Sequence, residues 1–274
     1  MQNTIKNLWN KRAANKSISL KEDGYKLVLD SSDHRGFKNE YIDHILKKYI
    51  KQYLAPQPTD TVLEIGSGVG RLTEYIAPLT KKVYGVDIAQ NFVHQCQTNP
   101  NKCDNTVYET PESFLTIPIP TINKMYCVWV LMFFEKDEEL IDTIAEYNQK
   151  INNGLECFLV LEQTSNKREI IEQDGKFFCC HRTIEEFEHI FFTAGFELKK
   201  KIIIKERNHG IIFKLLFNRY SYKILPNIFY KHLNFLLRAE HFLMNKILPS
   251  SITFSPSYPY DTLFILAPKK KGET

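Results

Sequence analysis

The sequence has no apolar stretch that approaches the roughly 20 residues needed to span a bilayer. Its first residues, Met-Gln-Asn-Thr-Ile-Lys, also lack the hydrophobic core of a secretory signal. These two absences argue against a membrane-spanning or secreted protein. We therefore expect a cytoplasmic protein.

A metal-binding pattern of cysteine and histidine is missing as well. The six cysteines form no C-x-x-C pair, and none has a nearby histidine at the spacing of a metal site. They stand at positions 96, 103, 127, 157, 179 and 180. We expect reduced, mostly buried thiols and no metal centre.

A large charge of one sign is also absent. The net charge of +4 is slight for 274 residues, and no separate basic domain stands out. Composition therefore gives no argument for nucleic acid as a partner. The length allows one large domain or two small ones, and we expect one core with additions.

Glycine is scarce, yet three of the eleven glycines stand at alternate positions within residues 66 to 70. The preceding run 62–65 suits a strand that is buried on both faces, and residues 71–76 follow with helical apolar spacing. Glycine permits a backbone turn that side chains would block, so something can approach this backbone closely. A glycine loop between a strand end and a helix start predicts a site for a nucleotide-type ligand.

The spacing of this loop narrows the class of ligand. A dinucleotide fingerprint requires G-x-G-x-x-G, and the position of its third glycine is occupied by Arg71. A Walker loop requires Lys-Ser or Lys-Thr after the glycines, and neither follows here. The spacing thus argues against both an NAD site and an ATPase or kinase site.

What remains is an acid two residues before G-x-G-x-G, and this resembles the first motif of the class I S-adenosylmethionine-dependent methyltransferases. A second apolar run, residues 83–86, ends at Asp87, where a carboxylate could accept two hydrogen bonds from a ribose diol. The alternative reading of Asp87 is a cap for the helix that begins at Ala89. Its place after the glycine loop favours the ligand role, and S-adenosylmethionine is the expected cofactor.

The chain alternates strands and helices from about residue 60 onward, which predicts an α/β fold with a doubly wound, mostly parallel sheet. We expect a helix over residues 138–151, and a capping box of Thr183 and Glu186 at the start of another. The resemblance implies a Rossmann-like methyltransferase sheet of seven strands with the last one antiparallel. The predicted strands are 62–65, 83–86, 106–108, 125–128, 155–161, 198–205 and 262–267.

The resemblance also implies which residues contact the cofactor. In that family the glycine-loop amides meet its amino-acid part, the acid after the second strand holds the ribose, and the next residue packs on adenine. The loop after the third strand usually offers a polar group to the adenine amine, and the segment after the fourth lines the methyl end. The residues at these positions are Glu64, Gly66, Ser67, Gly68, Gly70, Asp87, Ile88, Glu109 or Thr110, and Val128.

Methyl transfer from a sulfonium is an in-line displacement, so the protein mainly aligns the acceptor and excludes water. An alcohol acceptor also needs a base to remove its proton. Because ligands bind outside the carboxyl ends of the strands, the candidates are Glu162, His181 and His209. For each histidine alone, a solvated loop residue is the competing interpretation. Many family members place an acid before strand four and a histidine after it, where this chain has Asn123 and Phe133.

Two additions flank the predicted core. Residues 1–54 contain an amphipathic helix near 40–54 and are expected to form a helical cap or lid on a methyltransferase domain of residues 55–274. Residues 211–249, a mixture of aromatic and basic residues, are expected to form a helical insertion before the last strand. This insertion has three open interpretations: a cap over the active site, a homodimer face, or a peripheral contact with membrane.

The methyl acceptor is predicted by elimination. The segment after strand four lacks the Asn/Asp-Pro-Pro-aromatic motif of adenine N6 enzymes, which argues against a DNA base, and the modest charge argues against RNA. We expect a small molecule, with a hydroxyl of a sugar, glycan or other metabolite as the acceptor. The alternatives are a non-catalytic cofactor-binding or regulatory protein of the same fold and, with less support, an NAD-dependent oxidoreductase.

Overall fold

A computed structural model gives the structure of the chain. The residues it describes are 2–14, 25–30, 33, 35–119, 121–151, 154–204, 212, 215–216, 226–243 and 259–269. Of the residues singled out above, His209 lies outside the described residues.

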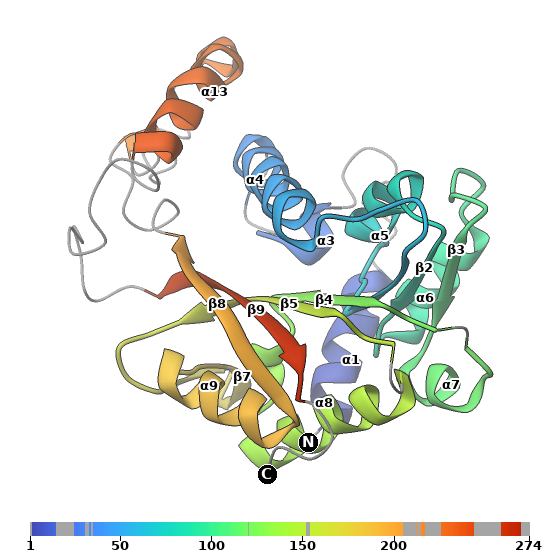
Figure 1. Cartoon of the computed structure of the whole chain (residues 1–274). Coiled ribbons are helices and arrows are strands. Elements are labelled where there is room, and N and C mark those ends of the chain that lie inside the picture. Colours follow the sequence, from blue (N-terminus) through green and yellow to red (C-terminus); the bar gives the residue numbers. More distant parts are fainter. Residues whose placement is uncertain are drawn as a thin grey trace.

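A seven-stranded sheet forms the centre of the structure (Figure 1). In sheet order the strands are β3 (Thr106–Glu109), β2 (Lys82–Val86), β1 (Thr61–Ile65), β4 (Lys124–Val128), β5 (Cys157–Thr164), β9 (Tyr260–Pro268) and β8 (Phe196–Ile204). The first five are parallel, and β9 is antiparallel to both of its neighbours. The predicted α/β class, the seven strands and the antiparallel last strand are therefore confirmed.

One strand extends further than predicted. We expected strand five to end at residue 161, so that Glu162 would follow it, but β5 continues to Thr164. The cause is the last strand, since β9 pairs Glu162 with Thr262 and Thr164 with Tyr260. Glu162 therefore lies within β5, where its backbone pairs with β9, one residue beyond the last pair of β5 with β4.

Two helical layers cover the sheet, one on each face. On one face lie α4 (Phe37–Leu54), α5 (Arg71–Ile76) with the 3-10 turn η1 (Ala77–Leu79), and α6 (Gln90–Thr98). On the other lie α7 (Pro111–Thr116), α8 (Asp137–Ile151) and α9 (Ile184–Thr193).

Strand side chains alternate between these layers. Val62 joins the core under α4 and α5, whereas its neighbour Leu63 joins the core under α8 and α9. Both are fully buried, which is the pattern of a sheet covered on both faces. The predicted capping box is present at the start of α9, where Thr183 and Glu186 bond reciprocally.

A hairpin that the sequence analysis did not predict follows β5. It consists of β6 (Glu169–Gln173) and β7 (Lys176–His181), which pair antiparallel as a separate two-stranded sheet. Its turn residues Asp174 and Gly175 have φ values of 55° and 68°, as a two-residue hairpin turn requires. The hairpin brings Phe178 against Phe133, which lies beside the cofactor cleft, with ring centroids 5.9 Å apart.

The remaining described elements are helical. They are α1 (Gln2–Ala13), α3 (Tyr25–Val28), the 3-10 turn η2 (Leu131–Phe133) and α13 (Asn227–Phe242). The predicted helix near 40–54 corresponds to α4, whose apolar face packs on the sheet. Within the described ranges, no helix combines the length and hydropathy needed to cross a bilayer. The domain boundaries proposed from the sequence stay a prediction.

Candidate cofactor and active site

The glycine loop connects β1 to α5 with three left-handed residues, since Gly66, Gly68 and Gly70 have φ values of 77°, 53° and 77°. A β-carbon on Gly66 would lie 2.2 Å from Cγ2 of Val130. The loop is anchored to the next strand, because the amides of Gly66 and Ser67 both donate to the carbonyl of Val86, at 2.7 and 3.0 Å. Glycine is therefore required here by backbone conformation and by close packing.

Asp87 stands at the end of β2 and ties this strand to the glycine loop. Its Oδ2 accepts from the Gly68 amide at 2.7 Å, and its Oδ1 accepts from the Ala89 amide at 2.8 Å. Burial raises the pKa of Asp87 to about 6. A carboxylate has about four acceptor sites, so these two bonds leave capacity for a diol. The capping interpretation is wrong, because α6 has Ala89 as its N-cap and no side-chain cap hydrogen bond, while the ligand interpretation stays a prediction.

Glu64 lies beneath the glycine loop. Its Oε2 accepts hydrogen bonds from the Thr73 hydroxyl of α5 and, at 2.9 Å, from the Tyr126 hydroxyl of β4. Burial raises the pKa of Glu64 to about 7. The acid of the first motif therefore links two neighbouring strands and the following helix at the base of the site.

A cavity of about 870 Å³ opens along these elements. Seven of the residues expected to contact the cofactor line it: Glu64, Gly66, Ser67, Gly68, Asp87, Ile88 and Val128. Gly70, Glu109 and Thr110 do not. The Glu109 carboxylate instead accepts from the Ser113 hydroxyl at 2.6 Å, and the Thr110 hydroxyl caps α7.

Three buried polar groups in the cavity wall lack hydrogen-bond partners: the Tyr147 hydroxyl and, beside the glycine loop, the Ser67 hydroxyl and Nε of Arg71. The other end of the Arg71 guanidinium pairs with Asp43 of α4. A hydroxyl and a guanidinium beside the glycine loop suit the amino-acid end of S-adenosylmethionine. The donor set therefore fits the cofactor. In the sequence analysis, Arg71 served only to argue against the dinucleotide fingerprint. Its position at the start of α5, directly after the glycine loop, was the signal for a ligand role.

The segment after β4 forms an aromatic wall. Trp129 has a positive φ of 55°, and its indole donates to Asp261 of β9 at 3.0 Å. Phe133 contacts Trp9 of α1 with ring centroids 5.3 Å apart. All three aromatic residues line the cavity together with Gln163. The family resemblance places the methyl end of the cofactor at this wall.

The side chains of Glu162 and Arg182 bond to the backbone of this wall and fix its conformation. Oε1 of Glu162 accepts from the amides of Val130 and Leu131 at 2.7 and 2.6 Å. The Arg182 guanidinium donates to the carbonyls of Leu131 and Phe134 at 3.3 and 2.8 Å. Both side chains are fully buried. Burial raises the pKa of Glu162 to about 7.

The structure places two of the three proposed catalytic residues. Glu162 and His181 are both buried beside the wall after β4, and neither lines the cavity. Their catalytic role, like that of His209, stays a prediction. In the described part of the chain, no group of three or more His, Cys, Asp or Glu side chains could hold a metal ion.

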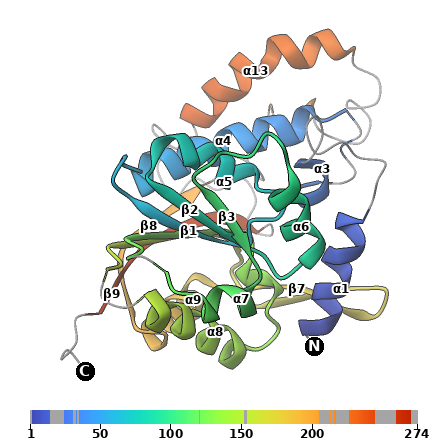
Figure 2. The same ribbon diagram turned by 90° about the vertical axis from the view of Figure 1, so that its right-hand side faces the viewer.

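Helix α1 lies across the cleft, next to α6 (Figure 2). Asn10 bonds twice with Asn91 of α6, each time at 3.1 Å. Farther along, Gln95 donates to the Ala13 carbonyl at 2.6 Å, and Lys6 pairs with Glu112 of α7 at 3.2 Å. The N-terminal helix therefore contacts both sides of the cavity, which is the position expected of a lid.

Comparisons with solved structures agree with this fold. A SAM-dependent methyltransferase of Leishmania major superposes with a TM-score of 0.57 at 11% identity, over 95% of this chain and 82% of that chain. The DhpI–SAH complex superposes with a TM-score of 0.55 at 12% identity, over 98% of both chains. At these identities the likeness concerns the fold.

Two curated relatives match part of the chain. A protein of Nanoarchaeum equitans named as an uncharacterized RNA methyltransferase is 29% identical over 139 residues, which are 50% of this chain and 29% of the relative. A protein of the same description from Staphylococcus aureus is 30% identical over 83 residues, or 30% of this chain and 18% of the relative. The chain thus spans less than a third of the length of either relative.

The family model described as AdoMet-dependent proline di-methyltransferase matches residues 7–223, most of the chain. This match extends from α1 through the glycine loop, Asp87 and the wall after β4. The chain therefore belongs to the AdoMet-dependent proline di-methyltransferase family.

Proposed function

We propose that this methyltransferase transfers its methyl group to the nitrogen of an amine. The observation that supports this proposal is the charge of the cavity wall. Carboxylates line the cavity at Asp30, Glu64, Asp87, Glu112, Glu135, Glu139 and Glu146, whereas the only cationic side chains that line it among the described residues are Arg12 and Arg71. Three of these carboxylates are paired with lysines outside the lining, Asp30 with Lys38, Glu112 with Lys6 and, at 3.9 Å, Glu139 with Lys136, and the others keep the wall acidic. An excess of carboxylates in a concave site attracts a protonated amine.

The chemistry of transfer also favours nitrogen. The acceptor lone pair attacks the sulfonium methyl, a carbon–nitrogen bond forms as the carbon–sulfur bond breaks, and the sulfonium becomes a neutral thioether. The amine loses its proton to water and attacks as the free base. A hydroxyl acceptor needs a positioned base instead, and no histidine lines the described part of the cavity. The sugar hydroxyl predicted from the sequence would need one of the carboxylates that line the cavity, or His209 outside the described residues, as its base.

The family description suggests the kind of amine. A proline nitrogen can take two methyl groups only when it is not part of a peptide bond, because an amide nitrogen has no free lone pair. A free proline or a proline at an amino terminus meets this condition. The cavity lies near the upper end of the usual 300 to 1,000 Å³ range for ligand sites, about 870 Å³, so it suits a small molecule or a chain end beside the cofactor.

RNA, the substrate in the names of the curated relatives, fits this site less well. Binding of a nucleic acid depends on Lys and Arg beside its phosphates, and this cavity presents mainly carboxylates. The acidic wall therefore favours an amine over a polyanion.

An acceptor panel tests the proposal directly. The protein is incubated with S-adenosylmethionine and, separately, a peptide with an N-terminal proline, free proline, a methyl glycoside and a single-stranded RNA. S-Adenosylhomocysteine release and product mass are measured. We expect turnover with the amines. Turnover with the glycoside alone would establish the hydroxyl function, and cofactor binding without turnover on any acceptor would support a regulatory protein.

Charge removal at Glu135, just before α8, and at Glu139 in its first turn provides the first prediction. The double variant Glu135→Gln/Glu139→Gln is expected to lower kcat/KM for a cationic amine about tenfold, mainly through KM, because two partly exposed charges near the cavity each contribute roughly 1 kcal/mol. Affinity for S-adenosylhomocysteine should be unchanged. Glu138→Gln, on the same helix but outside the cavity lining, is the matched control. Equal kinetics for all three proteins would contradict the role of the acidic wall.

A further inference from the structure

The segment 211–249 carries a charge that the rest of the chain lacks. It contains six basic residues and a single acid, Glu240, so its net charge is +5. Since the whole chain has a net charge of +4, all the other residues together sum to −1. The basic residues are Lys214, Arg219, Lys223, Lys231, Arg238 and Lys246. Such an asymmetry indicates an anionic partner for this segment.

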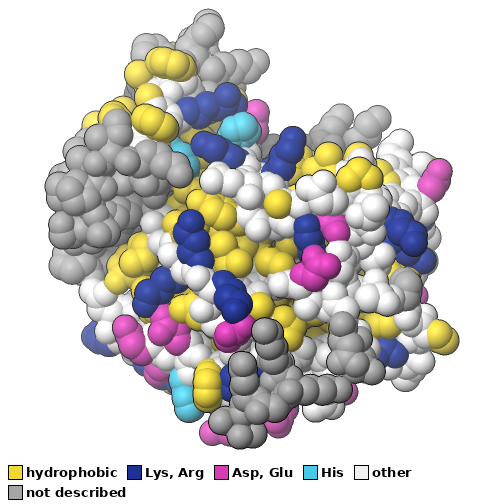
Figure 3. All heavy atoms as spheres, in the orientation of Figure 1, with side chains coloured by type: hydrophobic (Ala, Val, Ile, Leu, Met, Phe, Trp, Pro, Cys, Tyr) yellow, Lys and Arg dark blue, Asp and Glu magenta, His cyan; other side chains and the backbone are white. Residues whose placement is uncertain are grey.

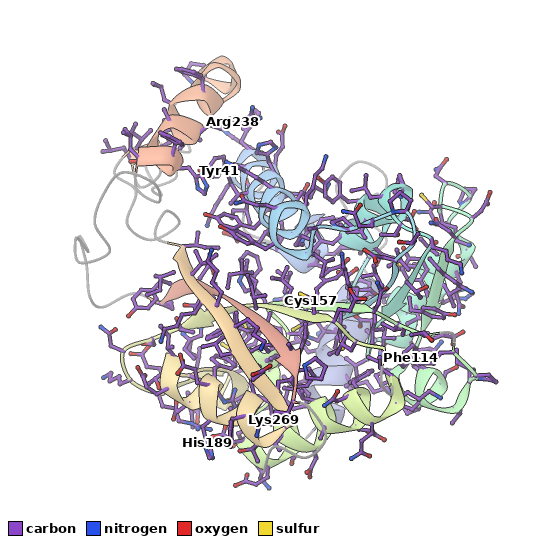
Figure 4. The ribbon with its side chains drawn as sticks, in the orientation of Figure 1. Tyr41, Phe114, Cys157, His189, Arg238 and Lys269 are labelled. Carbon is purple, nitrogen blue, oxygen red and sulfur yellow. The ribbon has the colours of Figure 1, made fainter. Side chains whose placement is uncertain are left out.

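Helix α13 lies in this segment and packs on α4 through one face. The Tyr41 hydroxyl of α4 donates to the Leu237 carbonyl at 3.3 Å, and the Tyr49 hydroxyl lies 3.4 Å from Nε2 of His241. The single acid, Glu240, accepts from the Ile212 amide at 2.6 Å. Figure 4 shows Arg238 on α13 near Tyr41 of α4. These contacts account for the buried face of α13.

The opposite face of α13 is apolar and exposed. Phe235, Leu236, Phe242 and Leu243 are 74%, 41%, 54% and 48% exposed. We call these four residues the outer stripe. The last three follow Phe235 by one, seven and eight positions, which places all four on one side of the helix. Figure 3 shows hydrophobic side chains gathered over α13 beside basic side chains. Exposed apolar groups of this size on one helix mark an interaction surface.

We propose that the outer stripe docks on the surface of an anionic lipid bilayer. Phe and Leu side chains of the stripe enter the interface between headgroups and acyl chains, and the net positive charge that the segment has in the sequence favours anionic headgroups. The positive charge of the segment favours an anionic bilayer over a second copy of this chain as the partner of the stripe. A second copy of this chain would bring two segments of charge +5 together, whereas an anionic bilayer neutralises that charge.

Vesicle sedimentation tests this docking on the full chain. The protein is mixed with vesicles of phosphatidylcholine alone or of equal parts phosphatidylcholine and phosphatidylglycerol, and the bound fraction is measured at low and high salt. We expect partitioning at least tenfold stronger into the anionic vesicles, and weaker binding at high salt because screening reduces the attraction. Absence of binding to anionic vesicles, or equal binding to both kinds, would overturn the proposal.

A variant of the stripe separates lipid docking from self-association. Phe235→Ser/Phe242→Ser leaves the contacts of Leu237 and His241 with α4, and it is expected to reduce binding to the anionic vesicles at least tenfold. Ile170→Ser, which removes an exposed apolar side chain from β6, should bind like the native protein. Light scattering measures the mass without lipid. A native dimer that becomes a monomer in the stripe variant would show that a second copy covers the stripe.

A second feature of the cavity is the buried hydroxyl of Tyr147. The Tyr147 side chain of α8 is 2% exposed, lines the cofactor cavity, and its hydroxyl has no hydrogen-bond partner. Its ring lies 5.9 Å from that of Phe114 on α7. Burial raises the pKa of Tyr147, and the charges of Glu146, Glu112 and Asp87 raise it further. A buried hydroxyl without a partner is expensive to keep.

We infer that the Tyr147 hydroxyl is a hydrogen-bond partner of the cofactor's adenine base. The side chains expected to meet adenine, Glu109 and Thr110, are instead engaged in α7 and do not line the cavity. The edge of adenine carries a hydrogen-bond donor and several acceptors. The Tyr147 hydroxyl can therefore either donate a hydrogen bond to the base or accept one from it. This inference rests on the established cofactor and not on the proposed acceptor.

Tyr147→Phe keeps the ring and removes only the hydroxyl. Calorimetry should show affinity for S-adenosylhomocysteine lowered about two- to tenfold, the range of one neutral hydrogen bond. The native protein should bind S-inosylhomocysteine, which alters the base edge, more weakly, and the variant should discriminate less. Tyr84→Phe, at a buried tyrosine that contacts Phe114 but not the cavity, is the control. Equal affinity of native protein and Tyr147→Phe, or unchanged discrimination, would overturn the inference.

Discussion

Replacing Asp87 by alanine is expected to lower affinity for S-adenosylhomocysteine by at least a hundredfold. Two charge-assisted hydrogen bonds to a ribose diol contribute about 1.5 to 3 kcal/mol each, and their sum corresponds to roughly two to four orders of magnitude. The same carboxylate also holds the Gly68 amide at 2.7 Å, so its loss loosens the loop that meets the rest of the cofactor. Isothermal calorimetry measures the change.

Two further variants make this result specific. Asp104→Ala removes an exposed acid from the connection before β3 and should bind like the native protein. Asp87→Asn keeps the shape and loses the charge, so it should fall between the native protein and the alanine variant. Native-like affinity in Asp87→Ala would remove Asp87 from the cofactor site and leave it with its bonds to the Gly68 and Ala89 amides alone.

The pH dependence follows from the same residue. Burial raises the pKa of Asp87 to about 6, and a bound diol favours the charged carboxylate, so binding at lower pH must release a proton. Affinity is then constant above about pH 7 and falls as pH drops below 6, by up to tenfold per pH unit. The Asn variant should lack this dependence. The folding stability of the protein without cofactor should depend on pH in the opposite direction. Because the pKa of Asp87 is higher in the folded protein than in the unfolded chain, the contribution of Asp87 to the free energy of unfolding decreases as the pH rises from about 4 through 6.

Local patterns predicted most of the sheet because each signal lies within a few residues. The run before Gly66 identified β1, and the capping box at Thr183 identified the start of α9. The hairpin β6–β7 had an equally local signal in Asp174-Gly175. It was missed because β6 mixes apolar and polar residues with little burial, and because the apolar run of β7 is only four residues long and pairs with β6 and not with the central sheet.

The site was harder to predict than the fold because its groups come together from distant parts of the chain. Asn10 reaches Asn91 across 81 positions, and Trp129 reaches Asp261 across 132. No periodicity or motif encodes such a pairing. Glu162 shows the same limit: its position near the end of β5 suggested a group facing the cleft, whereas its carboxylate bonds the amides of Val130 and Leu131.

Arg182→Met is expected to lower the free energy of unfolding by about 3 to 5 kcal/mol, which corresponds to a melting temperature lower by roughly 6 to 20 °C. The native guanidinium is fully buried and donates to Asp137 at 2.8 Å and to the carbonyls of Leu131 and Phe134. Methionine fills similar space but donates nothing, so both carbonyls lose a charged donor. Thermal unfolding of the purified protein measures the change.

Arg168→Met is the matched control, because Arg168 pairs with the same Asp137 at 2.7 Å while its side chain is 32% exposed. Exposed pairs contribute about 0 to 1 kcal/mol, so this variant should melt close to the native protein. Arg182→Met should also disturb the aromatic wall. In the native protein Glu162 accepts from the Leu131 amide and Arg182 donates to the Leu131 carbonyl. Loss of the second bond should make the segment that carries Trp129 and Phe133 more mobile. Similar melting of both arginine variants would mean that solvent reaches the wall and replaces the buried guanidinium.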